Sequence, residues 1–226
     1  MRTYAITLGL LTTTAVALAC SSSTATKGSA DGGEAGAGSG SGGGSGGSTG
    51  EAGIAPEAFI AATLGIGPSS PSTLCNVGST RSELDVGVAI TFQPATVADG
   101  NQQAGSTVHV SCAVFPSGGG FDIALEVSID GPAGGDVTII SPGGAGAVTL
   151  SGGAGIGGTF TRSDGTYTQS TCSLAFTYQG SAVPAAPPIA AGRIWGHLSC
   201  PAAQVSGGTG QCDAEADFLF EQCREH

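Results

Sequence analysis

The chain has 226 residues, of which 41 are glycine, about 18% against roughly 7% in an average protein. Its 17 acidic and 6 basic residues give a formal net charge of −11. This charge argues against nucleic-acid binding and against a polybasic membrane-surface patch, because both need clustered Lys and Arg. Collagen is excluded because glycine does not recur at every third position. A helical bundle is disfavoured because each glycine inside a helix costs about 1 kcal/mol.

The first twenty residues have the pattern of an export signal. Arg2 gives a positive start, and residues 5–19 form an apolar run that is too short for the roughly 20 residues of a transmembrane helix. The motif Ala17-Leu18-Ala19-Cys20 resembles the lipobox of bacterial lipoproteins, although Leu stands two residues before the cysteine rather than three. The resemblance implies removal of residues 1–19 and lipid attachment at Cys20. An uncleaved anchor and an ordinary secreted protein are the alternatives.

The residues after Cys20 predict a disordered, lipid-anchored tether over 20–52. From residue 21 to residue 52 the chain has 12 Gly and 8 Ser and no apolar side chain larger than Ala, so nothing can be buried to offset the ordering entropy. Ser21, in place of the Asp typical of inner-membrane retention, implies by the same resemblance an outer-membrane or cell-surface location. The layout of signal, tether and folded domain is similar to that of myxobacterial-type surface lipoproteins.

Residues 53–226 predict one all-β domain. Apolar and polar residues alternate over 84–92, 108–114, 121–129, 172–178 and 194–200, which indicates strands with one buried and one solvated face. Gly and Pro clusters between these runs indicate turns. We therefore predict an antiparallel β-sandwich or jelly roll of about seven to nine strands. One short helix is expected at Pro56–Leu64, because Pro stands near its first turn and Gly65 follows its end.

Beyond Cys20 the chain has six cysteines, an even number that predicts three disulfides in an exported domain: Cys75, Cys112, Cys172, Cys200, Cys212 and Cys223. Fifteen connectivities are open to six cysteines. We expect Cys112–Cys172, because both fall on the apolar face of their strands, then Cys200–Cys212 across a loop, and Cys75–Cys223 between the domain ends. Zinc is disfavoured because the closely spaced cysteine pairs of structural zinc sites are absent; we expect no metal and no cofactor.

Polar residues near the C-terminus form a candidate binding surface. Asp213, Glu215 and Asp217 alternate toward one face, and His197 shares its outward register with Trp195. Carboxylates in this pattern fit the acid and base of a glycosidase, oxygen ligands for calcium, or simply the solvated face of a strand, and we favour the last. No catalytic residue is assigned to these or to the other two histidines, His109 and His226.

Three hypotheses for function follow. The first is a non-enzymatic cell-envelope lipoprotein, a structural or interaction module that contacts the membrane through its lipid and an envelope protein or polysaccharide through its domain. The second is a glycan- or calcium-dependent binding module, and the third an envelope hydrolase. Clustering of the candidate surface (Trp195, His197, Asp213, Glu215 and Asp217) in a concave pocket would favour the second or third. Dispersal of these residues over sheet faces would favour the first.

Overall fold

The computed structural model describes residues 54–71, 73–75, 77, 82–131, 134–141 and 146–225. All of them belong to one unit, Thr49–His226. The predicted signal peptide, Cys20 and the tether lie outside the described residues, as does His226. Within the described part every regular element is a β-strand, and none of its elements is a helix long and apolar enough to span a membrane.

Among the described residues, nine strands of five residues or more build the main sheet, four two-residue strands extend it, and two more two-residue strands form a separate hairpin. The longer strands are β1 (Glu57–Gly65), β2 (Ser82–Val86), β5 (Ser106–Ser117), β6 (Gly120–Ile129), β7 (Gly135–Ile140), β9 (Gly152–Arg162), β10 (Gly165–Ala175), β14 (Arg193–Val205) and β15 (Gln211–Glu221). The short ones are β3 (Val97–Ala98), β4 (Gln102–Gln103), β8 (Val148–Thr149), β11 (Thr177–Tyr178), β12 (Ser181–Ala182) and β13 (Ile189–Ala190).

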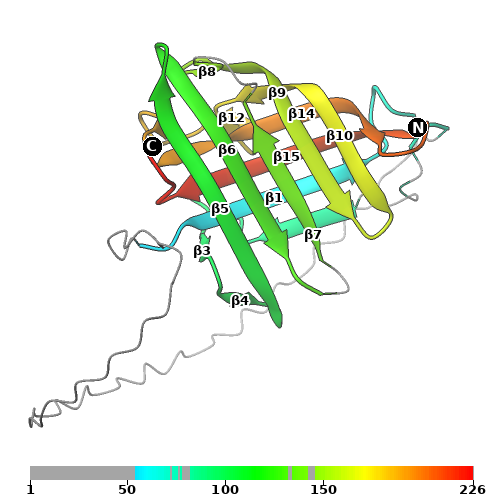
Figure 1. Cartoon of the computed structure of the whole chain (residues 1–226), viewed down its shortest axis with the longest axis horizontal. Helices are drawn as coiled ribbons and strands as arrows, with labels where there is room; N and C mark the ends of the chain where they lie inside the picture. The colour runs from blue at the N-terminus through cyan, green and yellow to red at the C-terminus, as the bar shows by residue number, and fades with distance from the viewer. Residues whose placement is uncertain are drawn as a thin grey trace, which may run out of the picture. The chain divides into compact units, whose positions relative to one another are not determined.

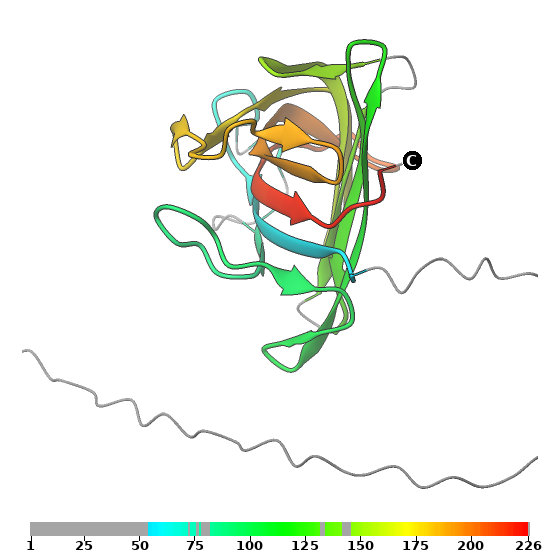
Figure 2. The same ribbon diagram turned by 90° about the vertical axis from the view of Figure 1, so that its left-hand side faces the viewer.

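The strands form one antiparallel sheet in the order β2-β1-β15-β14-β10-β9-β7-β6-β5-β4, and β11 and β12 form a separate hairpin. The sheet folds over into two layers. Strands β5, β6, β7, β9 and β10 make one layer, and β1, β2, β14 and β15 cross behind it at a steep angle (Figure 1). Figure 2 shows the two layers edge-on. The predicted all-β, sandwich-like fold is confirmed.

The core lies between the two layers, and the predicted alternation accounts for most of it. Val108, Val110 and Val114 of β5 are buried, as are Leu125 and Val127 of β6, because inward side chains recur at every second position. Both layers contribute to the same cluster of buried residues, which also contains all six cysteines of the domain. The core therefore holds apolar side chains and disulfides together.

The helix expected at Pro56–Leu64 is wrong, because residues 57–64 lie in strand β1 and Pro56 comes just before it. This strand is interior to its layer and pairs with β15 on one side and β2 on the other. Ile60 packs in the main core, whereas Phe59 packs on the opposite face in a second cluster. Because both faces of β1 are covered, its sequence lacks the alternation that marks a half-exposed strand. A proline can stand just before a strand as well as at the start of a helix, so Pro56 does not distinguish the two.

The strand expected over 84–92 is shorter than predicted. Leu84 and Val86 are buried, but the strand ends at Val86, and Val88, Ile90 and Phe92 are exposed. Gly87 has φ +79°, a backbone conformation that ends the extended run. A Cβ there would collide with the carbonyl oxygen of Ala95. The apolar alternation therefore continues into a surface loop.

Three disulfides form as predicted in number, but all three expected pairings are wrong. The bonds are Cys75–Cys212, Cys112–Cys223 and Cys172–Cys200. The expected partners Cys112 and Cys172 do both point inward, yet β6, β7 and β9 separate their strands within one layer. Cys200 and Cys212 lie on the adjacent strands β14 and β15, but Cys200 bonds to Cys172 of β10 and Cys212 bonds to Cys75. Three disulfides indicate an oxidising, extracytoplasmic environment.

Candidate functional site

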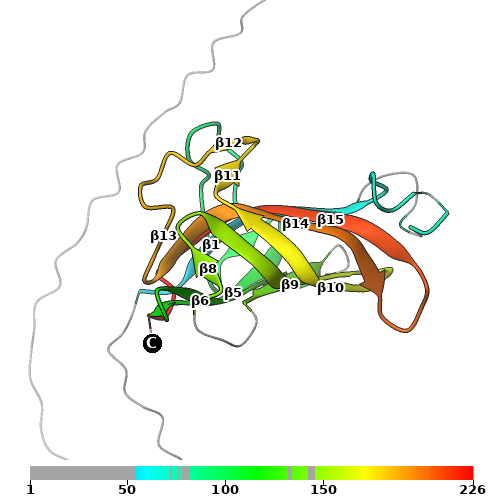
Figure 3. The same cartoon turned by 90° about the horizontal axis from the view of Figure 1, so that it is seen from above.

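Trp195 points away from the main core, as its predicted register requires, but the β11–β12 hairpin covers it. The β11–β12 hairpin lies outside β14 and β15 (Figure 3), and Trp195 packs there in a cluster with Phe59, Tyr178 and Leu219. The centroids of the Trp195 and Tyr178 rings are 5.5 Å apart, and only 1% of the tryptophan is exposed. The indole therefore fixes the hairpin to the sheet and offers no aromatic platform at the surface.

His197 and Asp217 face each other across β14 and β15 and form an ion pair. His197 Nδ1 lies 2.9 Å from Asp217 Oδ1. The hydrogen bond that His197 donates to the Asp217 carboxylate raises the pKa of His197, and burial opposes this rise in part. The other carboxylate oxygen of Asp217 accepts a hydrogen bond from the Gln179 backbone N–H at 3.4 Å. Asp217 thus ties the β11–β12 turn to β15.

Asp213 serves a similar structural purpose at the opposite end of the acidic run. Its Oδ1 accepts a hydrogen bond from the Ala202 N–H, and its Oδ2 accepts one from the Ser69 N–H, both at 3.2 Å. Ala202 has φ +72° within a bulge of β14, so the carboxylate supports an irregular backbone. Glu215 lies between the two aspartates, half-buried, with Ser199 beside it on β14.

The five candidate residues therefore do not meet in one pocket. Trp195 is covered, His197 and Asp217 pair near the hairpin, and Asp213 supports the bulge at the other end of β15. Among the described residues, no group of three or more His, Cys, Asp or Glu is placed to hold a metal ion. The side chains of the candidate surface hold loops and strands together.

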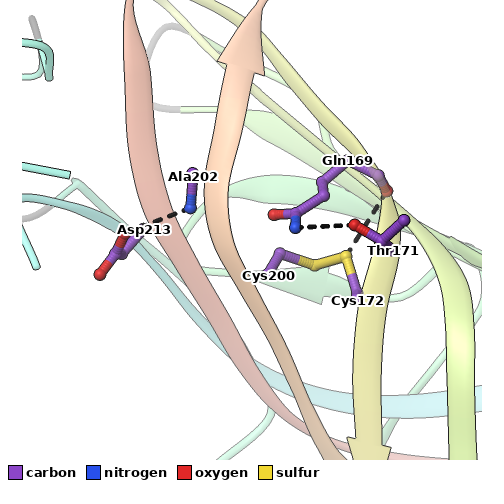
Figure 4. Close-up of a disulfide and its surroundings, with 6 residues drawn as sticks. All are labelled: Gln169, Thr171, Cys172, Cys200, Ala202 and Asp213. Atoms are coloured by element: carbon purple, nitrogen blue, oxygen red, sulfur yellow. Dashed lines mark hydrogen bonds between the residues drawn. A yellow bond between two sulfur atoms is a disulfide. The ribbon is translucent and has the colours of Figure 1, made fainter. Parts of the chain in front are cut away.

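A groove opens elsewhere, where the two layers join at β10 and β14. These strands pair at Thr168↔Gln204 and again at Ser173↔Ser199. Between these points both strands are irregular, with register shifts in β10 after Gln169 and in β14 after Cys200. The pairing has a gap there: no backbone pair joins residues 169–171 to residues 201–203, whereas Cys172 and Cys200 lie opposite each other, with Cα atoms 4.4 Å apart and a disulfide between their side chains (Figure 4).

The groove has a volume of about 560 Å³, and its lining is uncharged, with polar and apolar parts in about equal share. Twelve residues of β7, β9, β10 and β14 surround it. Two are the amides Gln169 and Gln204, and none has a titratable side chain. Five carry hydroxyl groups: Thr138, Thr159, Thr168, Ser170 and Thr171. Each hydroxyl can donate and accept hydrogen bonds, so the surface suits a ligand rich in polar but uncharged groups.

Two adjacent glycines of β9 shape the groove in different ways. A Cβ on Gly158 would lie 2.7 Å from the Sγ of Cys200 and 3.1 Å from that of Cys172. The disulfide therefore requires glycine at this inward position. Gly157 faces the groove, and a Cβ there would meet only the Ile140 carbonyl oxygen, at 3.4 Å. Its missing side chain leaves the floor of the groove open.

Gln169 has hydrogen-bonding capacity that the fold does not use. Its Nε2 donates to Thr171 Oγ1 at 3.1 Å, and its Oε1 is buried without a hydrogen-bond partner. The side chain lies over the gap between β10 and β14, beside the disulfide (Figure 4). Leaving a buried acceptor unpaired costs about 1–3 kcal/mol. Because this oxygen is buried, a molecule in the groove would reach it only after the side chain turns toward the groove.

The groove was not predicted from the sequence. The signals are present but weak: a glycine pair inside an alternating run, and three consecutive polar residues, 169–171, before Cys172. Glycine in a strand often marks a bulge or a close backbone approach. Neither signal shows that two irregular strands lie side by side.

Comparisons with protein-family models, with curated proteins and with solved structures found no match.

Proposed function

We propose that the chain is a lipoprotein of the cell envelope, anchored through Cys20, whose β domain is a non-enzymatic interaction module that binds a ligand in the groove over the Cys172–Cys200 disulfide. The lipobox-like motif supports the anchor, and the three disulfides agree with export. The Gly/Ser-rich residues 21–52 would let the domain move away from the membrane surface, with a root-mean-square reach of about 30 Å.

The observation that carries the binding role is the groove itself, an open cavity lined by five hydroxyl groups and two amides and by no charged side chain. General acid–base catalysis needs a titratable group within reach of the reacting atoms. The twelve lining residues supply none, which supports binding over hydrolysis at this site.

A calcium-dependent site on β15 is less well supported. Calcium takes six to eight oxygen ligands that converge on one point. Asp213 and Asp217 instead direct their oxygens to different backbone N–H groups and to His197. Binding calcium would first require these bonds to break.

Substitution of Cys20 tests the anchor in the full-length chain, expressed in a Gram-negative host. We expect the parent protein to incorporate labelled palmitate and to fractionate with membranes. The Cys20→Ala variant should be unlabelled and remain an unprocessed precursor, whereas the control Ser22→Ala should behave like the parent. A Cys20→Ala protein that is still cleaved and membrane-bound would contradict lipid attachment at this residue.

A further inference from the structure

We infer that the groove over the Cys172–Cys200 disulfide is a site for a neutral saccharide, a conclusion that rests on the proposed role of this groove in ligand binding. Charge gives the first argument. Residues 53–226 contain 14 acidic residues, 4 Arg and no Lys, and the groove lining contains no Lys or Arg. An anionic ligand would meet the negative field of the domain without a counter-charge. A cationic ligand would find no carboxylate in the lining.

The hydrogen-bonding groups of the groove give the second argument. Five hydroxyls and two amides line it, and these groups pair best with ligand hydroxyls, which donate and accept in turn. Gln169 Oε1 has no partner within the chain and would meet a ligand donor once the side chain turns toward the groove. If the amide were turned the other way, its exchanged nitrogen would need an acceptor, and a sugar hydroxyl would serve in either case.

The shape of the groove gives the third argument. Its volume of about 560 Å³ falls within the range of about 300–1,000 Å³ typical of small-molecule sites. Gly157 leaves the floor open, and Ile140, which is 49% exposed, offers an apolar contact for the C–H face of a sugar ring. No aromatic residue lines the groove, so we expect weak binding that depends mainly on hydrogen bonds.

A peptide strand fits the groove less well. Strand addition needs a run of free backbone donors and acceptors along a sheet edge. The gap between β10 and β14 is closed on both sides by paired residues, at Thr168↔Gln204 and Ser173↔Ser199. The Cys172–Cys200 disulfide also holds the two strands together. The groups that face the groove are side-chain hydroxyls and amides, which suit a polyhydroxylated ligand better than an inserted strand.

An array experiment on the full-length protein in mild detergent tests the inference. The array carries neutral gluco-, manno- and galacto-oligosaccharides, uronate-containing and sulfated oligosaccharides, and peptides. The parent protein is compared with Gln169→Ala and Gly157→Val, both in the groove, and with Gln102→Ala, an exposed glutamine of β4 away from it. Thermal melting of each variant verifies folding.

We expect binding to at least one class of neutral oligosaccharide. Binding should weaken about tenfold in Gln169→Ala, the effect of one lost hydrogen bond, and be lost in Gly157→Val, whose side chain fills the floor. The Gln102→Ala control should bind like the parent. Two groove variants are used so that a folding defect in one leaves the other informative.

Binding to anionic oligosaccharides alone, to peptides alone, or to no neutral oligosaccharide would overturn the saccharide inference. Neutral binding that both folded groove variants leave unchanged would overturn it as well. Different outcomes decide the proposed function. Peptide binding that is sensitive to the groove variants would keep the groove as a ligand site, and the palmitate labelling of Cys20 would keep or remove the anchor whatever the array shows.

Discussion

The acidic run on β15 and the groove between β10 and β14 use their polar groups in opposite ways. Asp213 and Asp217 bond to backbone N–H groups of neighbouring segments and to His197. In the groove, the Gln169 Oε1 has no partner within the chain. The conspicuous charged residues hold the fold together, whereas plain hydroxyls and amides surround the open cavity. The acids of β15 are therefore bonded within the fold, whereas the groove presents uncharged polar groups to solvent.

Removing one disulfide from each region should have the largest effects. In the chain-entropy model, loss of Cys75–Cys212, separated by 137 residues, lowers the free energy of unfolding by about 5 kcal/mol. Loss of Cys172–Cys200, separated by 28 residues, lowers it by about 3–4 kcal/mol. Urea denaturation of the two double-alanine variants measures both. Only Cys172→Ala/Cys200→Ala should also impair binding in the groove. Equal impairment in both would argue that the regions are not distinct.

The two glycines of β9 offer a finer test at the groove itself. We expect Gly158→Ala to lower the free energy of unfolding by about 1–3 kcal/mol, because its Cβ would overlap the disulfide sulfurs. Gly157→Ala is the matched control and should change stability by less than about 0.5 kcal/mol, since its Cβ makes only an ordinary contact. Denaturant melts compare the two. Equal stability of the variants would mean that the disulfide does not lie against β9 as described.

The His197–Asp217 pair should give the smallest effect, and its sign depends on pH. Because Asp217 raises the pKa of His197 above its ordinary value of 6.5, the folded state binds this proton more tightly than the unfolded state. The stabilisation is complete below about pH 6.5 and is lost as pH rises through the higher folded pKa. Asp217→Asn should therefore cost up to about 1 kcal/mol at low pH and less at high pH.

Denaturation of the parent and Asp217→Asn proteins on either side of this pH range measures the effect. Asparagine keeps a side-chain oxygen for the Gln179 N–H, so the charge is the main change. The matched control is Asp130→Asn, which removes the partner of His109 in a more exposed pair. A larger loss in that control, or a cost of Asp217→Asn that grows with pH, would contradict the assigned role of the pair.

The sequence predicted the elements that have one wet face and one buried face. Apolar and polar residues alternate from Val108 to Val114 and from Ile123 to Val127, and the apolar ones at every second position are buried as predicted. Strand β1 was mistaken for a helix because Phe59 and Ile60 are both covered, on opposite faces. An alternating pattern appears only where one face of a strand is buried and the other is solvated, so a strand buried on both faces shows no period of two.

Long-range partners were beyond the reach of the sequence. The inward positions of Cys112 and Cys172 were predicted correctly, but their partners depend on which strands the layers place side by side. The outward register of Asp213 and Asp217 was also predicted, but not the loops that use their oxygens. The groove forms only where two irregular strands lie side by side, and each irregularity by itself changes the sequence pattern only slightly.

Nuclear magnetic resonance of the isotope-labelled protein tests the central claim most directly. Titration with the neutral oligosaccharide that the array identifies should shift the backbone amide signals of Gly157, Gln169 and Thr171, and leave those of Asp213 and Asp217 unchanged. This result would locate the ligand where hydrogen-bonding capacity is spare. Shifts confined to the β15 acids and His197, with the groove signals unchanged, would contradict the account.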